Sequence, residues 1–209
     1  LKLAFALFIA YILNFKLKGV NFFRTAYYIP SILGGSIAIA ILWRAVFNTD
    51  GLINTVITAF GLPKINWMAS DNGALAVIVL LRVWQFGSAM VIFLAGLQSI
   101  DKTYYEAAQL DGATYWQQLR SVTIPLIMPA LNNAVVISVV GGLKVFDIVQ
   151  SLTNGGPGNA TSVFGTLIYS SFSSGSYGRG CAASMILTFF VLLIALPTNR
   201  FISRKEVEV

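Results

Sequence analysis

The chain has 209 residues, of which 56% are hydrophobic and only 11% are charged, and its mean hydropathy is +0.76. Soluble domains average about 25% charged residues, so this composition excludes a disordered chain and indicates a polytopic membrane domain. The net charge is +6, and the charged residues lie between apolar runs. This distribution indicates membrane topology rather than nucleic-acid binding.

Histidine is absent and Cys181 is the single cysteine. A catalytic His, a His-ligated metal, an intrachain disulfide and a thiolate cluster are therefore excluded. Cys181 begins an apolar run, and we expect it to be a small buried residue.

Apolar runs predict about five membrane spans in chain order. Residues 1–13 are shorter than the roughly 20 residues that a spanning helix needs, so we expect them to be the end of a span whose N-terminal part is truncated. Further spans are expected at 27–47, 73–97, 132–152 and 181–201. Between them, 52–60 is expected to be a short amphipathic helix on the membrane surface, and 163–172 a short apolar segment.

The distribution of Lys and Arg predicts the orientation, because cytoplasmic loops carry the excess of these residues. One set of alternate loops contains eight of them: Lys16, Lys18, Arg24, Lys102, Arg120, Arg200, Arg204 and Lys205. The other set contains at most four: Lys2, Arg44, Lys64 and Arg179. We therefore expect the loop at 98–131 and the C-terminus on the cytoplasmic side, and the glycine-rich loop at 153–161 outside.

The polar stretch between the third and fourth spans is the most informative part of the sequence. Good helix formers at 104–110 precede Asp111 and Gly112, which form a helix stop. Thr114 can cap a second helix that ends near 119, and Pro125 limits its continuation. A helical hairpin exposed between two spans indicates a docking surface, and an ordinary membrane-surface loop is the alternative on physical grounds alone.

The same stretch carries a family motif. Glu106-Ala107-Ala108, then Gly112, then 122–125 resembles the EAA loop of ABC importer permeases, with Val122 and Ile124 as conservative replacements. The extended form through Asp111, Gly112 and Ala113 is typical of carbohydrate importers. Segments 23–30 and 43–51 resemble the second-span region of that family, and 94–100 precedes the loop as it does there. Segments 145–147 and 152–157 resemble the maltose and glycerol-phosphate type of permease, so the likeness covers nearly the whole chain.

The resemblance implies an all-α transmembrane bundle, a single permease domain over 1–209. Its coupling loop would lie at about 98–130 and its extracytoplasmic Gly-Gly-Pro loop at about 152–162. The implied coupling residues are Glu106, Ala107, Ala108, Asp111, Gly112, Ala113 and Pro125. Gly155, Gly156 and Pro157 would lie where a solute-binding protein docks.

The implied function is the permease subunit of an ATP-driven, binding-protein-dependent importer for a sugar or related polyol, in a bacterial cytoplasmic membrane. The implied partners are a second homologous permease, two ATP-binding cassette subunits, an extracytoplasmic solute-binding protein and the lipid bilayer. The sequence contains no Gly-x-x-x-x-Gly-Lys-Ser/Thr motif, so ATP and Mg²⁺ are expected on the partner ATPases, with no cofactor on this chain and no enzymatic activity.

Ionisable residues inside spans are candidates for function because they are expensive to place there. Arg82, Lys144 and Asp147 are expected at a common depth. Lys144 and Asp147, three residues apart, are expected to pair on one helical face, and Arg82 is expected to be able to join them from the third span. With the neighbouring Trp84, Gln85 and Phe146 they form a candidate sugar pathway. The alternative is a self-neutralising structural cluster.

Two other classes of protein compete with the importer subunit. The intramembrane charges would also suit an ion-coupled secondary transporter, although such a transporter has no use for the hairpin. A membrane-embedded enzyme would find few groups for acid–base or nucleophilic chemistry in a chain without His.

Overall fold

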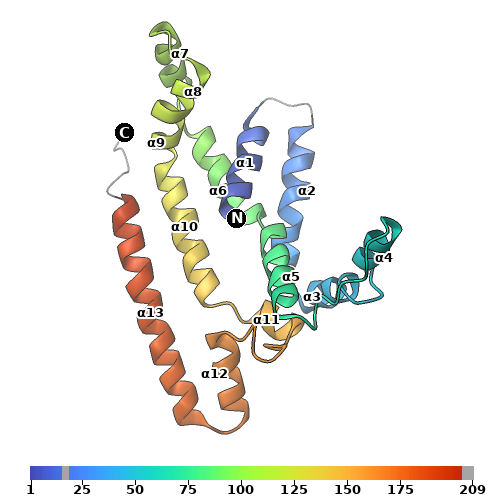
Figure 1. Cartoon of the computed structure of the whole chain (residues 1–209). Coiled ribbons are helices and arrows are strands. Elements are labelled where there is room, and N and C mark those ends of the chain that lie inside the picture. The colour runs from blue at the N-terminus through green and yellow to red at the C-terminus, as the bar shows by residue number, and fades with distance from the viewer. Residues whose placement is uncertain (16–18, 204–209) are drawn as a thin grey trace. The chain divides into compact units, whose positions relative to one another are not determined.

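The computed structural model describes residues 1–15 and 19–203, and these residues form helices without any strand among them (Figure 1). The first seven helices are α1 (Lys2–Asn14), α2 (Val20–Leu33), α3 (Ile37–Val46), α4 (Leu52–Ala59), α5 (Asp71–Trp84), α6 (Gly87–Gln98) and α7 (Lys102–Leu110). The others are α8 (Tyr115–Gln118), a π-helical turn (Leu119–Thr123), α9 (Ile124–Leu126), α10 (Met128–Leu143), α11 (Asp147–Leu152), α12 (Phe164–Ser173) and α13 (Tyr177–Ser203). The all-α prediction is confirmed for this part of the chain. Lys16, Lys18, Arg204 and Lys205, which entered the orientation argument, lie outside the described residues.

Two helical stretches are long and apolar enough to cross a membrane, namely α5 with α6 over Asp71–Gln98, and α13. They coincide with the spans expected at 73–97 and 181–201. Up to two more spans arise if bent helix pairs cross together: α2 with α3, bent by 99°, and the helices over Tyr115–Leu126 with α10, bent by 61°. The apolar α1 is shorter, with 13 residues.

Two expected spans differ from the observed helices. The run at 27–47 is divided between α2 and α3, and the adjacent glycines Gly34 and Gly35 lie in the turn between them. The run at 132–152 leaves the helix after Leu143, directly behind Gly141 and Gly142. Glycine lowers helix stability through its backbone entropy, so paired glycines are weak points in an apolar run that hydropathy alone reads as continuous.

The described residues divide into two compact units. Unit 1 takes its residues from Leu1–Ile29, Phe86–Val140 and Leu192–Val209. In it α1 packs along α6 (Figure 1), where Ala6 and Ala10 of α1 are fully buried in the cluster that contains Met90 and Phe93. Small residues let helix backbones approach closely, and this contact fixes α1 against the span that leads into the hairpin.

Close contacts also tie α10 to its neighbours in unit 1. A Cβ added at Gly96 of α6 would lie 2.6 Å from the Cβ of Ala130, so only glycine fits there. The buried Asn132 donates its amide N–H groups to Asn199 Oδ1 at 3.1 Å and to Ser203 Oγ at 2.9 Å, which links α10 to α13. Such interhelical hydrogen bonds hold helices together in an apolar environment.

Unit 2 comprises Pro30–Gln85 and Gly141–Val191. Its core joins α3, α5 and α11 through the buried residues Ala40, Phe47, Val77, Leu81, Ile148 and Leu152. Aromatic pairs extend this core: the ring centroids of Trp43 and Trp84 are 5.3 Å apart, and those of Phe47 and Trp67 are 5.6 Å apart. Offset and edge contacts of this kind add to the free energy of burial.

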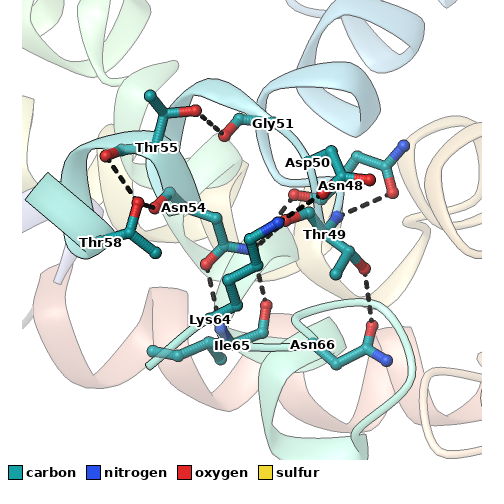
Figure 2. A network of polar contacts seen from close by, with 10 residues as sticks. All are labelled: Asn48, Thr49, Asp50, Gly51, Asn54, Thr55, Thr58, Lys64, Ile65 and Asn66. Atoms are coloured by element: carbon teal, nitrogen blue, oxygen red, sulfur yellow. Dashed lines mark hydrogen bonds and ion pairs between the residues drawn. The ribbon is translucent and has the colours of Figure 1, made fainter. Parts of the chain in front are cut away.

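The segment 48–66 of unit 2 folds around one buried amide (Figure 2). Asn54 of α4 is 1% exposed, and its Nδ2 donates to the carbonyl oxygens of Asn48 at 3.3 Å, Thr49 at 3.0 Å and Ile65 at 2.8 Å. Its Oδ1 accepts from the Ile65 N–H at 3.0 Å. The Asn54 side chain therefore joins the residues before α4, at 48–49, to the residue after it at 65.

The helix expected at 52–60 is observed as α4. Its exposed apolar side chains Leu52 and Val56 are followed by Phe60, with a spacing of four residues that aligns them on one face. Beside them, the Lys64 ammonium lies 2.7 Å from Asp50 Oδ1 and holds the pKa of that exposed carboxyl below its usual value. Placement of this helix on a membrane surface stays a prediction.

Candidate functional site

The hairpin expected from the sequence is formed by α7 and α8, which lie next to each other in unit 1 (Figure 1). Asp101 caps α7, because its carboxylate accepts from the Thr103 N–H at 3.0 Å, and this backbone hydrogen bond holds the pKa of Asp101 below its usual value. The helix ends at Leu110, and Gly112 has φ of +73°, in the left-handed region that favours glycine. The expected helix and its stop at Gly112 are confirmed.

The second helix of the hairpin begins after Thr114, whose N–H donates to Gln117 Oε1 at 2.7 Å in a capping arrangement. It runs through the π-helical turn directly into α9, so Pro125 does not end it. Pro125 lies in α9 directly behind the π-helical turn. The expected helix 114–119 is therefore part of a longer helical run.

The outer surface of the hairpin is exposed. Glu106 and Ala107 are exposed and α7 buries none of its residues. Leu110 is 90% exposed and Trp116 is 74% exposed. Large apolar side chains that are exposed on one hairpin are typical of a protein interface.

Tyrosine hydroxyls join the hairpin to other helices of unit 1, and the sequence analysis did not predict this. The Tyr115 hydroxyl of α8 hydrogen-bonds the Tyr11 hydroxyl of α1, and their ring centroids are 6.5 Å apart. The Tyr105 hydroxyl of α7 lies 3.0 Å from Oγ1 of the buried Thr123, in the π-helical turn. Residues 104 sequence positions apart meet here, and no local pattern could have indicated it.

Two candidate pathway residues pack inside unit 2. Trp84 stacks with Trp43, as described above. Gln85 is only 7% exposed, and its Nε2 donates to the Gly34 carbonyl at 2.8 Å while its own carbonyl accepts from Ser31 Oγ at 3.2 Å. The Gln85 amide therefore joins the end of α5 to the bend after α2.

The expected pairing of Lys144 with Asp147 is wrong. Within residues 1–15 and 19–203, the ion pair present is that of Lys64 with Asp50. Because α10 ends at Leu143 and α11 begins at Asp147, Lys144 and Asp147 do not share a helix. Asp147 instead interacts electrostatically with the half-buried Arg82. The common depth of these charges stays a prediction.

Phe146, the remaining pathway candidate, precedes α11. Its ring lies 5.3 Å from that of Tyr169 on α12, measured between centroids. A Cβ added at Gly165 would lie 2.8 Å from the Phe146 Cβ, so the start of α12 fits closely against it. The candidate pathway residues therefore differ in exposure. Gln85 is buried, Lys144 and Asp147 are exposed, and the other three are half-buried: Arg82, Trp84 and Phe146.

The Gly-Gly-Pro loop is an ordered, hydrogen-bonded structure. Gly155 has φ of +85°, and the buried Thr161 donates its hydroxyl to the Gly156 carbonyl at 2.7 Å. Gly155 is buried, whereas Gly156 and Pro157 are half-buried. Their docking role stays a prediction.

Cys181, expected to be buried, is exposed. The buried residues of α13 are Gly180 and Ala183, on either side of Cys181 in the sequence. Adjacent positions on a helix point about 100° apart, so Cys181 faces away from the packed side.

The comparisons with known proteins agree with this all-helical architecture. The family described as "binding-protein-dependent transport system inner membrane component" matches residues 3–204. The probable ABC transporter permease protein YesP of Bacillus subtilis is 40% identical over 200 residues, covering 94% of this chain and 65% of that protein. The trehalose/maltose transport system permease protein MalF of Thermococcus litoralis is 38% identical over 207 residues, covering 96% of this chain and 68% of that protein.

A solved structure shows the same fold. A bacterial ABC transporter involved in the import of the acidic polysaccharide alginate superposes with a TM-score of 0.85 at 26% identity, covering 96% of this chain and 72% of that one. The fold and the sequence together define an inner-membrane transport component. The chain belongs to the family of binding-protein-dependent transport system inner membrane components. It spans 65% of the length of YesP and 68% of that of MalF.

Proposed function

We propose that this chain is the permease subunit of an ATP-driven, binding-protein-dependent importer for a sugar or related polyol. The observation that carries the proposal is the exposed hairpin of α7 and α8, which presents Glu106 and the Gly112 bend within a chain of this family. The printed names of relatives add the substrate class, since they include permeases for trehalose and maltose, for multiple sugars and for lactose. The family and the fold neighbours give no support to an ion-coupled secondary transporter.

In this proposal the hairpin docks on a cytoplasmic ATPase subunit, with Glu106 facing that subunit and Gly112 forming the bend. Two such ATPases and a second permease complete the importer. ATP and Mg²⁺ bind the ATPases, and this chain performs no covalent chemistry and binds no nucleic acid. The C-terminus lies in the cytoplasm, and the Gly-Gly-Pro loop faces an extracytoplasmic solute-binding protein. A fold neighbour supports that partner class, since its title describes a complex with an alginate-bound periplasmic protein.

Cysteine crosslinking in membranes tests the docking role. Cys181→Ser removes the single native thiol, and Leu110→Cys then places one thiol on the exposed end of α7. We expect a crosslink from Leu110→Cys to the ATPase subunit whose yield changes when ATP is added. The native Cys181, exposed on α13, is the control and is expected to give no such product. Absence of the ATPase crosslink at Leu110 and at neighbouring exposed positions would overturn the proposal.

Charge reversal provides a functional test of the same surface. Glu106→Lys is expected to abolish sugar uptake and coupled ATP hydrolysis while the protein inserts normally, because the side chain is exposed and its replacement disturbs no packing. Gln109→Lys, which adds a positive charge at another exposed position of α7, is the matched control and is expected to retain most uptake. Normal transport by Glu106→Lys would argue against the docking role of this residue.

A further inference from the structure

A cleft of about 1080 Å³ lies within unit 2, between the end of α10, the loop after α11, α12 and the start of α13. Pockets for drug-sized ligands span roughly 300–1,000 Å³, so this cleft has room for a ligand of more than one sugar ring. None of the candidate pathway residues from the sequence lines it. It is therefore a separate feature of the molecule.

The cleft is lined by side chains of types that can form hydrogen bonds with hydroxyl groups. Amides are contributed by Gln150, Asn154 and Asn159, and hydroxyls by Ser170 and Ser173, among others. Amides and hydroxyls both donate and accept, as sugar hydroxyls do. This chemistry matches a polyhydroxylated ligand.

The charge in the cleft has one sign. Arg179 lines it, and the described lining contains no Asp or Glu. The ion pair found in the described part of the chain does not involve Arg179, so its guanidinium is available to a ligand. A guanidinium binds a carboxylate in a bidentate manner, through two parallel hydrogen bonds that a neutral hydroxyl cannot reproduce.

An aromatic surface completes the site. Tyr169 lines the cleft and is 52% exposed, and its ring packs against that of Phe146, with 5.3 Å between the ring centroids. A supported, half-exposed tyrosine offers a flat apolar face and a polar hydroxyl at one position. Sugar rings have apolar faces and polar edges, and both would be accommodated here.

We propose that this cleft binds an oligosaccharide that carries carboxylates, with Arg179 recognising the acid and Tyr169 supporting a sugar ring. The inference rests on the proposed import of sugars and narrows the substrate to acidic saccharides.

Protection of a thiol from labelling tests the site in the complete importer, without need for transport. Ser173→Cys in a Cys181→Ser background places one thiol in the cleft at an exposed position. Its rate of reaction with a maleimide is measured with trigalacturonate as the acidic probe and maltotriose as the neutral probe of equal ring number. We expect trigalacturonate to slow the labelling and maltotriose to leave it unchanged at the same concentration. The importer with the wild-type chain is the control: its single thiol on this chain, Cys181, lies outside the cleft lining and is expected to react at one rate with either probe.

Substitution of Arg179 then tests the recognition of the acid. Arg179→Gln in the same background is expected to require about tenfold more trigalacturonate for equal protection, as for the loss of a charge-assisted contact. Arg179→Lys keeps the positive charge but loses the planar guanidinium. The protection of this variant by trigalacturonate is expected to lie between that of the parent with Arg179 and that of Arg179→Gln. Tyr169→Ala is expected to weaken protection, and Tyr169→Phe to retain it.

Three outcomes would overturn the inference: equal protection by both probes, protection that survives Arg179→Gln, or a Ser173→Cys thiol that does not react at all while Cys181 does. The last outcome would show that another subunit covers the cleft. Failure of the proposed function is a different result, namely no ATP-dependent uptake of any sugar by the wild-type importer.

Discussion

Asn54 shows how much of a loop can depend on one residue, because its side chain bonds backbone groups at three separate positions of segment 48–66 (Figure 2). Asn54→Ala removes these hydrogen bonds, each of which contributes about 0.5–1.5 kcal/mol to stability. We therefore expect a clear fall in the melting temperature of the purified protein. Thr58→Ala is the control, since the Thr58 hydroxyl bonds only its own helix at 2.9 and 3.0 Å. Equal melting of the two variants would show that the amide does not hold the loop.

Gln85 is the pathway candidate that the structure places in a packing role. We predict that Gln85→Met lowers the thermal stability and the yield of assembled protein, because the Gly34 carbonyl loses its donor. The KM for sugar uptake is expected to stay within about twofold of the wild-type value, since one lost hydrogen bond to substrate would change it by about tenfold. A tenfold rise in KM with unchanged stability would restore Gln85 to the substrate pathway.

Polar residues in apolar runs can be found from the sequence, but their partners only in part. Arg82 was expected to be able to join Lys144 and Asp147, and it does interact with Asp147, whereas the pairing of Lys144 with Asp147 is wrong. Gln85 bonds a bend 51 positions away, which no local pattern indicates. Asn54 was missed because its amide is unremarkable in a short polar-looking helix. Its role depends on the return of the chain at Ile65.

At the scale of elements, the link between α8 and α1 defines how the hairpin can act on the rest of unit 1. Since Tyr11 lies on a helix that packs along α6, a force on α8 reaches that helix pair through the two hydroxyls. We expect Tyr115→Phe and Tyr11→Phe each to lower the amount of sugar imported per ATP hydrolysed. The double variant is expected to be no worse than either single variant, as for two partners in one hydrogen bond.

Reconstituted vesicles provide the measurement, with uptake and ATP hydrolysis followed in the same sample. Tyr104→Phe removes a hydroxyl from another exposed tyrosine of α7 and is the matched control, expected to keep the wild-type ratio. Additive losses in the double variant would mean that the two hydroxyls act independently of each other.

The elements themselves could be predicted to different degrees. The hairpin was correctly derived because its signals are local: Asp111 and Gly112 stop one helix and Thr114 starts the next. The helix ends at Leu33 and Leu143 were not, because apolar side chains continue on both sides of the paired glycines and hydropathy does not register the break. The π-helical turn at 119–123 was also missed, since no sequence pattern in the loop separates it from an α-helix.

At the scale of the whole molecule, the chain is a helical membrane component with an exposed hairpin, and its sequence contains no phosphate-binding loop. In the proposed function, energy for uphill uptake enters through the ATPase subunits. An ATP-driven importer requires ATP hydrolysis, whereas an ion-coupled transporter requires an ion gradient. These two energy sources can be removed separately.

We predict that uptake by the complete importer in vesicles stops when the ATPase subunits are inactivated, and continues when ionophores collapse the proton and sodium gradients. The physical reason is that, in the proposed function, the exposed surface around Glu106 and Trp116 would couple this chain to closure of the ATPase subunits. Arg82, which interacts electrostatically with Asp147, provides the control: Arg82→Gln is expected to impair assembly without making uptake dependent on a gradient. Uptake that survives loss of ATPase activity but fails with the ionophores would contradict the importer and favour ion coupling through Asp147.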